Sequence, residues 1–356
     1  MTPELMPVLA AFRLDSKVVS CERYGCGHIN VTYLVVTESG RRYILQKVNN
    51  HIFKDVDGLM ENIIAVTAHL RQQISDPRRV LTLVPTVDDK LYLHHEDGSY
   101  WRVYDFVEGS ICLQAPESSD DFYQSAVAFG DFQQQLKEFP AHTLHEVIPK
   151  FHNTADRYRI FREVLAKDPM GRAESVREEI EFALAREAEA ATLVNLLAEG
   201  KLPLRVTHND TKLNNVMLDD ATRKPLCVID LDTVMPGLAA YDFGDSIRFG
   251  AATAAEDEKD LSKMYLDLEM FAAYTEGFLE GAAGSLTEAE IAYMPWGARL
   301  MTLECGMRFL TDHLEGDTYF HIQREGQNLD RCRTQFKLVA DMETKWAQMA
   351  EIVKNA

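Results

Sequence analysis

The chain of 356 residues is poor in basic side chains: 37 Lys and Arg stand against 56 Asp and Glu, a formal net charge of −19. This imbalance disfavours nucleic acid and anionic membranes as partners. The six cysteines are scattered without a Cys-x-x-Cys pair, which disfavours zinc and disulfide roles. No charged apolar leader opens the chain, and no apolar run approaches the roughly 20 residues that span a bilayer. We therefore expect a cytoplasmic monomer without nucleic acid or membrane partners.

The pattern of the chain changes near residue 107. The residues before it contain short β-type runs between turn residues, and one amphipathic helix at 58–74 follows the third run. The expected strands lie at 18–24, 32–37, 42–48, 81–84, 91–94 and 101–106. Long amphipathic helices are expected at 121–139, 154–167, 174–199, 256–278, 287–315 and 329–354. The sequence therefore predicts an α+β fold with a small antiparallel β lobe, residues 1–107, and a larger, mostly helical lobe, residues 108–356.

The main functional signal lies in residues 206–232. His208, Asp210 and Asn215 have the spacing H-x-D-x-x-x-x-N, and Asp230 ends an apolar run twenty residues after Asp210. Short strands are expected here at 204–207, 215–218 and 226–229. Phosphoryl transfer requires a group that positions the acceptor hydroxyl and oxygen ligands that hold Mg²⁺ against the nucleotide phosphates. The pattern predicts Asp210 as the catalytic base and Asn215 and Asp230 as Mg²⁺ ligands.

This motif resembles the catalytic loop and the metal-binding Asp of protein kinases, with three departures, one of which is that no A-P-E motif follows a long activation segment. Asn209 replaces the Arg of H-R-D, and the segment from Asp230 to Asp232 replaces D-F-G. With these departures, the motif resembles that of the aminoglycoside phosphotransferase and choline kinase branch, whose members phosphorylate small molecules. Within that branch, five stretches resemble the N-acetylhexosamine 1-kinases: 24–30, 43–46, 205–215, 229–233 with 235–237 and 242–246, and 304–310 with 315–317.

The resemblance implies a two-lobed, protein-kinase-like fold. It also implies an ATP- and Mg²⁺-dependent kinase that phosphorylates the anomeric 1-hydroxyl of an N-acetylhexosamine, such as N-acetylglucosamine or N-acetylgalactosamine. In such kinases the sugar is contacted from the glycine-containing loop and from a late helix. The matching residues here are His28, Arg308 and, beyond the helix, Tyr319.

The nucleotide is expected to bind the strand-rich lobe. Gly25 and Gly27 lie in a turn between two expected strands, where small residues let backbone N–H groups approach phosphate. Tyr104, Phe106 and Val107 are expected to supply an apolar slot and hinge backbone groups for adenine.

A phosphate-binding Lys is expected on the third strand of a kinase, in the pattern V-A-I-K. The matching residues, from Tyr43, place Gln46 at the Lys position, whereas Lys47 points to the opposite face of the strand. The sequence leaves open which of the two serves the phosphates. Glu61 on the following helix is the available carboxylate for an ion pair with a cation on this strand.

Three further polar residues near the motif have expected supporting roles. His208 is expected to hold the loop by hydrogen bonding, and Asp242 to support the catalytic loop from the following segment. For Asp232, a supporting or loop-capping role and a metal contact both stay open, because adjacent residues of a strand point to opposite faces.

Alternative functions are a choline, homoserine or aminoglycoside kinase of the same fold. A haloacid-dehalogenase-type phosphatase would use Asp230 as nucleophile and Asp232 as acid, with Asp245 in its metal motif. The short distance in sequence between Asp230 and Asp245 disfavours this function, because such phosphatases need a whole α/β domain between the two. A silent binding module is disfavoured because the base and both metal ligands are present.

Overall fold

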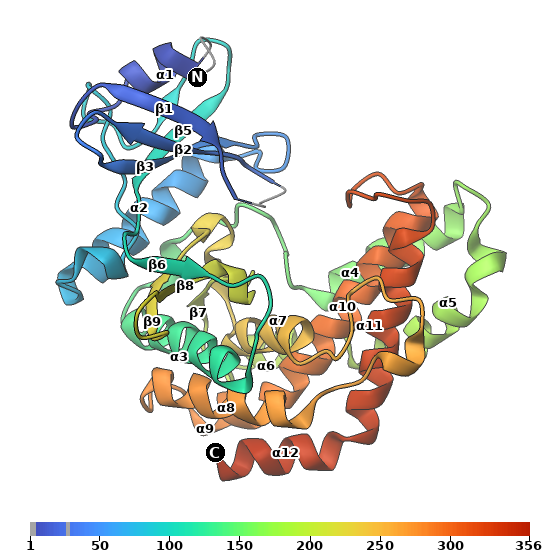
Figure 1. The fold of residues 1–356 in the computed structure, drawn as a ribbon. Helices are drawn as coiled ribbons and strands as arrows, with labels where there is room; N and C mark the ends of the chain where they lie inside the picture. The colour runs from blue at the N-terminus through green and yellow to red at the C-terminus, as the bar shows by residue number, and fades with distance from the viewer. Residues whose placement is uncertain (1–4, 26–28) are drawn as a thin grey trace. The chain divides into compact units, whose positions relative to one another are not determined.

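The protein is described by a computed structural model that covers residues 5–25 and 29–356 (Figure 1). It divides into two compact units that are each discontinuous in sequence. Unit 1 comprises residues 1–111, 143–149 and 217–235, and unit 2 comprises 112–142, 150–216 and 236–356. The division into continuous domains, 1–107 and 108–356, stays a prediction.

Unit 1 is built on a five-stranded antiparallel sheet in the order β1-β2-β3-β5-β4. Its elements are α1 (Met6–Ala10), β1 (Val18–Arg23), β2 (Val31–Thr37), β3 (Arg42–Val48), α2 (Val56–Gln73), β4 (Leu93–His94) and β5 (Tyr100–Asp105). Val35, Leu45 and Val103 are fully buried in its core. The predicted strands and the helix after the third strand are confirmed, except that 81–84 forms only an isolated bridge, between Leu83 and Tyr104. Pro85 follows this segment and has no N–H with which to extend a ladder.

Two smaller sheets contain the segments around the catalytic motif. β6 (Ser110–Cys112), β8 (Val216–Asp219) and β9 (Pro225–Val228) form one sheet in the order β6-β8-β9. β7 (Arg205–Thr207) pairs with β10 (Met235–Gly237). The three strands predicted around the motif are therefore confirmed to within about one residue at each end, the usual uncertainty of strand bounds.

Unit 2 is mainly helical, and the long helix α10 lies in its core with Leu303, Met307 and Leu310 fully buried. Its helices are α3 (Ser119–Gln135), α4 (Thr154–Lys167), α5 (Arg177–Leu184), α6 (Thr192–Ala198), α7 (Ala239–Gly250), α8 (Leu268–Ala282), α9 (Glu288–Ala292), α10 (Met294–Glu315), α11 (Gln327–Thr344) and α12 (Trp346–Asn355). α7 packs on α10 where Gly244 meets Gly297, and a Cβ on either glycine would overlap the backbone of the other helix.

Several predicted helix bounds were wrong. The helix predicted at 174–199 is broken into α5 and α6. The one predicted at 287–315 is interrupted before α10, because Pro295 occupies the first turn of a new helix. The helix predicted to begin at residue 256 begins only after Asp267, whose carboxylate accepts two N–H groups of the first turn.

The helix α7 was missed, because its segment contains Gly244 and ends at Gly250, and glycine is a poor helix former. The helix predicted at 329–354 is likewise two helices, α11 and α12, which meet at Lys345. The mixed α+β class with an antiparallel sheet is confirmed.

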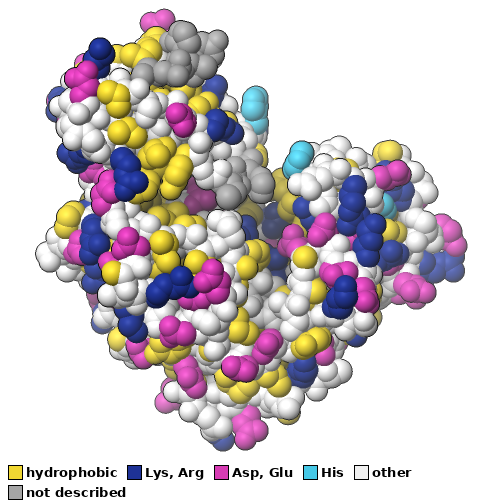
Figure 2. Space-filling model, viewed as in Figure 1, with side chains coloured by type: hydrophobic (Ala, Val, Ile, Leu, Met, Phe, Trp, Pro, Cys, Tyr) yellow, Lys and Arg dark blue, Asp and Glu magenta, His cyan; other side chains and the backbone are white. Residues whose placement is uncertain are grey.

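Charged side chains of both signs are dispersed over the face shown in Figure 2, with carboxylates and basic groups interspersed. Within the described residues, no helix has the combination of length and apolar character that crossing a membrane requires.

Candidate active site

The loop that carries the H-x-D motif follows β7 and is anchored to α7. Asp242 accepts hydrogen bonds from the backbone N–H groups of His208 and Asn209, at 2.9 and 2.8 Å, and from the Gln133 amide at 2.9 Å. Asn209 adopts a left-handed conformation, φ 64°, which Asn tolerates better than most residues. Burial raises the pKa of Asp242, although the N–H donors oppose this shift. The predicted supporting role of Asp242 is confirmed.

A second anchor lies one turn further along α7. Asp245 accepts the Thr211 N–H at 3.1 Å and is held by Arg248, whose Nε and Nη2 atoms lie 3.0 and 2.8 Å from one carboxylate oxygen. The second branch of Arg248 contacts Glu256 at 2.9 Å. Asp245 therefore fastens the catalytic loop, and this role differs from the metal role that the phosphatase alternative assigned to it.

Asp210 lies between these anchors and keeps 28% of its side chain exposed. Its carboxylate contacts Lys212 Nζ at 2.7 Å and accepts a hydrogen bond from Asn215 Nδ2 at 3.0 Å. Burial alone would raise the pKa of Asp210, but the Lys212 ammonium and the Asn215 amide lower it overall. Asp210 is therefore a carboxylate at neutral pH, in the protonation state that a base requires.

Lys212 was not singled out from the sequence, although it lies inside the motif two residues after Asp210. Asp210 raises the pKa of Lys212, so its ammonium stays charged. Two hydrogen bonds orient the Asn215 amide: its Nδ2 atom donates to the backbone carbonyl and to the carboxylate of Asp210. Its Oδ1 atom makes no hydrogen bond to any described residue, which leaves a hard oxygen of the kind that Mg²⁺ prefers.

In unit 1, the segment after β9 carries Asp230 and Asp232. Asp230 has a left-handed backbone, φ 58°, and begins a short 3₁₀ turn at Leu231–Thr233. Asp232 is buried, pairs with Arg102 Nη2 at 2.6 Å and accepts a hydrogen bond from Asn30 at 2.5 Å. Of the two roles left open for Asp232, these contacts are those of a supporting residue.

The predicted nucleotide residues on β3 have unexpected partners. The Gln46 Oε1 atom accepts from Arg102 Nε at 2.9 Å, whereas Lys47 lies over the Trp101 ring at 5.5 Å. Glu61 is 2.7 Å from His145 Nε2, so the prediction that it partners this strand was wrong.

The glycine-containing turn is only partly described. Gly25 has φ 77°, a conformation that favours glycine, and no atom lies where its Cβ would be. Gly27 and His28 lie outside the described residues, so their predicted contacts with phosphate and sugar stay predictions.

The predicted adenine segment follows β5. Tyr104 is buried and lies 5.3 Å from the Arg102 guanidinium. The Phe106 N–H donates to the Arg42 carbonyl at 3.2 Å, and the Val107 carbonyl accepts from Ser110 at 2.6 Å. These two backbone groups are therefore already engaged within unit 1.

Arg308 on α10 lies among three aromatic rings of unit 2. Its guanidinium carbon is 5.4 Å from the Phe151 ring, 5.8 Å from Tyr319 and 5.3 Å from Phe320. Tyr319 is 60% exposed. Throughout the described part of the chain, Arg308 has no hydrogen bond or ion pair, so its five N–H donors are open to a ligand.

Glu304, one turn before Arg308, was also not singled out. It is buried and contacts His152 Nδ1 at 3.0 Å and the Thr154 hydroxyl at 2.8 Å. Burial alone would raise the pKa of Glu304, but the hydrogen bond with His152 and the nearby guanidinium groups of Arg157 and Arg308 lower it overall. The other ring nitrogen of His152 lies 3.3 Å from the Asn209 carbonyl, which links this cluster to the catalytic loop.

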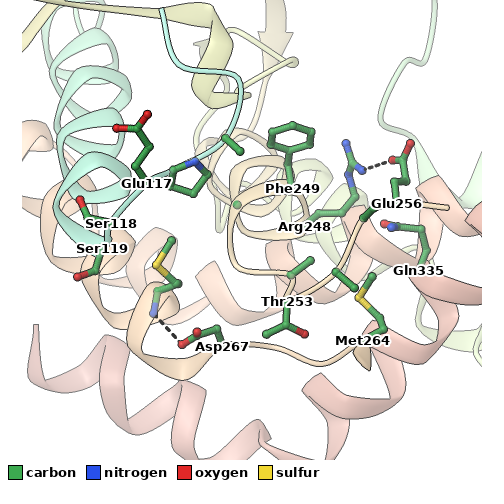
Figure 3. A pocket seen from close by; sticks show the side chains of 17 residues that line it. Glu117, Ser118, Ser119, Arg248, Phe249, Thr253, Glu256, Met264, Asp267 and Gln335 are labelled. Atoms are coloured by element: carbon green, nitrogen blue, oxygen red, sulfur yellow. Dashed lines mark hydrogen bonds and ion pairs between the residues drawn. The ribbon is translucent and has the colours of Figure 1, made fainter. Parts of the chain in front are cut away.

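Unit 2 also contains a cavity of about 530 Å³ beside the second loop anchor (Figure 3). Figure 3 shows Arg248, Phe249, Glu256 and Gln335 around it. The Gln335 Oε1 atom is buried without a hydrogen bond from the described residues. None of the predicted site residues lines this cavity.

Side chains that commonly bind metal ions hold one ion together when several of them lie close to one another. Across residues 5–25 and 29–356, no group of three or more His, Cys, Asp or Glu side chains is arranged to hold a metal ion.

Comparisons with known proteins agree with the fold. Residues 20–276 match the model described as the phosphotransferase enzyme family. An aminoglycoside phosphotransferase from Alicyclobacillus acidocaldarius is 14% identical, with 100% of this chain and 97% of that chain covered and a TM-score of 0.63. A microcompartment-associated aminopropanol kinase is 16% identical, with 97% of each chain covered and a TM-score of 0.59.

A third structure is an amicoumacin kinase in complex with AMP-PNP, Ca²⁺ and its ligand, 14% identical, with coverage of 100% and 94% and a TM-score of 0.57. At these identities the structures establish the kinase-like fold. Together with a family match across most of its length, they show that this chain belongs to the phosphotransferase enzyme family, the group of small-molecule kinases that includes the aminoglycoside phosphotransferases.

Proposed function

We propose that this protein is an ATP- and Mg²⁺-dependent kinase that phosphorylates the anomeric 1-hydroxyl of an N-acetylhexosamine. The observation that carries the kinase chemistry is the ionised Asp210, held by Lys212 and Asn215 on a loop that is fastened twice to α7. The sugar rests on the sequence resemblance and on the surroundings of Arg308.

Asp210 is proposed to accept the proton of the acceptor hydroxyl. A sugar hydroxyl is far less acidic than a carboxylic acid, whose reference pKa is about 3.9, so the proton moves late in the reaction. Until then, Asp210 orients the hydroxyl toward the γ-phosphorus. Lys212 is well placed beside Asp210 to offset negative charge as the phosphoryl group is transferred.

Asn215 and Asp230 are proposed to hold Mg²⁺, which would neutralise charge on the nucleotide phosphates. The free Oδ1 atom of Asn215 supports its part in this proposal. Asn215 directly precedes β8, and Asp230 follows β9, the neighbouring strand of the same small sheet. Gly25, Gly27 and Gln46 would lie along the phosphates.

Adenine is proposed to bind along Tyr104, Phe106 and Val107. Because the Phe106 N–H and the Val107 carbonyl are engaged, the Phe106 carbonyl and the Val107 N–H remain for the base. These are one acceptor and one donor, which matches the edge of adenine.

The surroundings of Arg308 favour an uncharged acceptor over an amine. Aromatic rings that recognise a cationic ligand leave their faces open to it. Here the rings of Phe151, Tyr319 and Phe320 already surround a guanidinium. A choline or an aminoglycoside would meet like charge there, whereas sugar hydroxyl and acetamide oxygens would accept its N–H groups.

Choline, homoserine and aminoglycoside kinases are the competing functions, and a substrate screen separates them. ADP release should be measured with N-acetylglucosamine, N-acetylgalactosamine, galactose, choline, homoserine and kanamycin. Turnover is expected with the N-acetylhexosamines, and the product should be an acid-labile sugar 1-phosphate. Turnover only with choline or kanamycin would refute the sugar assignment and leave the kinase assignment standing.

Replacing Arg308 with Ala should reduce kcat/KM for the sugar about 5- to 150-fold, because a sugar oxygen would lose a partner worth about 1–3 kcal/mol. The KM for ATP should change little. The measurement is steady-state kinetics with each substrate varied in turn. Arg177, an exposed residue paired with Glu174, provides the matched Arg→Ala control. A loss shared equally by both substrates, with a lower melting temperature, would assign Arg308 a structural role.

A further inference from the structure

The third strand of unit 1 lacks the lysine that a kinase normally presents to the nucleotide phosphates. Gln46 stands at its position, and Lys47 faces Trp101 on the other side of the sheet. A cation nevertheless lies next to this position. Arg102 of β5 is the direct cross-strand partner of Gln46 in the antiparallel register.

Arg102 is buried, with only 1% of its side chain exposed, and its polar contacts join β5 to two other segments of unit 1. Its Nε donates to Gln46 Oε1 on β3 at 2.9 Å, and its Nη2 pairs with Asp232 at 2.6 Å. Asp232 in turn accepts from Asn30 Nδ2 at 2.5 Å, and Asn30 is three residues after Gly27 in the sequence. The Asn30 Oδ1 atom accepts the Asn49 N–H at 3.0 Å, just after β3.

The charge state of this network follows from its geometry. Burial alone would lower the pKa of Arg102, but Asp232 and, further away, Asp230 raise it overall. A buried guanidinium is tolerated only when it is paired, and here one carboxylate balances it. The positive charge of Arg102 is therefore paired with Asp232, on the segment that also carries the proposed metal ligand Asp230.

We propose that Arg102 is the positioning residue that replaces the missing strand lysine, moved by one strand within the same sheet. By holding Asp232, it sets the backbone that presents Asp230 to the Mg²⁺–nucleotide complex, and through Asn30 it fixes the end of the glycine-containing turn. This proposal rests on the proposed kinase function. It requires no direct contact between Arg102 and phosphate.

The test removes the positive charge of Arg102 from β5 and, in a second variant, restores a positive charge on β3. Binding of Mg²⁺–ADP to the intact protein is measured by calorimetry without any acceptor, and kcat and KM are measured for both substrates. Arg102→Gln is expected to weaken Mg²⁺–ADP binding about 10- to 100-fold, the usual effect of losing a residue that orients a metal ligand. The KM for the acceptor should stay unchanged.

The double variant Gln46→Lys/Arg102→Gln returns a cation to β3 beside Asp232. It is expected to recover part of the lost nucleotide affinity, which a merely structural Arg102 would not predict. Arg41→Gln is the matched control, because Arg41 forms an exposed ion pair with Asp105 in the same unit. The Arg41→Gln variant should bind Mg²⁺–ADP with the same affinity as the unmodified protein.

An Arg102→Gln variant that folds and binds Mg²⁺–ADP within about twofold of the unmodified protein, less than 0.5 kcal/mol, would overturn the proposal. If that variant does not fold, Arg102→Lys and Asp232→Asn carry the test, and unchanged affinity in both would overturn it equally. Because nucleotide binding is measured without acceptor, a failed sugar screen leaves this result interpretable. Absence of Mg²⁺–ADP binding by the unmodified protein would refute the kinase function and this inference together.

Discussion

Replacing Asp210 with Asn should lower kcat about 10²- to 10⁴-fold, the usual contribution of a positioned general base. The amide keeps the shape of the side chain and can still contact its neighbours, but it cannot accept the hydroxyl proton. The KM for ATP should be nearly unchanged, because Asp210 is proposed to act on the acceptor. Steady-state kinetics with a coupled ADP assay provides the measurement.

The pH profile gives a second readout for Asp210. Since its pKa is lowered below the ordinary Asp value, the carboxylate stays ionised through the neutral range. Its contribution to the rate should therefore be constant there and be lost only as the pH falls through that lowered pKa. Asp220→Asn, an exposed carboxylate in the β8–β9 turn, is the control and should be silent. Turnover close to normal in Asp210→Asn would show that another group takes the proton.

Replacing Asp230 with Ala should abolish measurable turnover, because a metal ion contributes several kcal/mol of charge stabilisation and each 1.36 kcal/mol is about tenfold in rate. The backbone dictates which variant is informative. Asp230 has φ 58°, a conformation that Asn tolerates and Ala resists. Asp230→Asn therefore separates loss of the ligand from backbone strain, and Asp230→Ala is expected to lose stability as well.

The measurement for Asp230 is a Mg²⁺ titration of both activity and nucleotide binding. Asp230→Asn should require much higher Mg²⁺ and fail to reach normal turnover, while its melting temperature stays close to that of the unmodified protein. An unchanged Mg²⁺ dependence would remove Asp230 from the metal site. Formation of an acid-stable aspartyl phosphate would instead revive the phosphatase chemistry, although the antiparallel sheet and the family match already oppose it.

Much of unit 1 followed from local sequence patterns. Its strands are rich in β-branched and aromatic residues, and its turns contain residues that break strands, so both signals are local. The bounds of the helices of unit 2 were harder to predict, because each helix end depends on a single residue. Asp267 as a cap and Pro295 in a first turn moved two predicted boundaries.

The helix α7 shows why a buried element escapes prediction. Its polar residues Asp242, Asp245 and Arg248 recur at helical spacing, but the glycine at position 244 argues against a helix when the local sequence is considered alone. Contact with α10 overrides that local preference, since Gly244 and Gly297 permit the close approach of the two backbones.

The sequence by itself determined which groups are available for chemistry, because the spacing of Asp210, Asn215 and Asp230 is a property of one continuous segment. Only the tertiary structure decided what holds them. Lys212 was present in the motif, but its contact with Asp210 is a matter of side-chain conformation. The pair of Arg102 and Asp232 joins residues 130 positions apart, and no local pattern encodes such a contact. A buried charge is identified only by what surrounds it, and those surroundings exist only once the chain has folded.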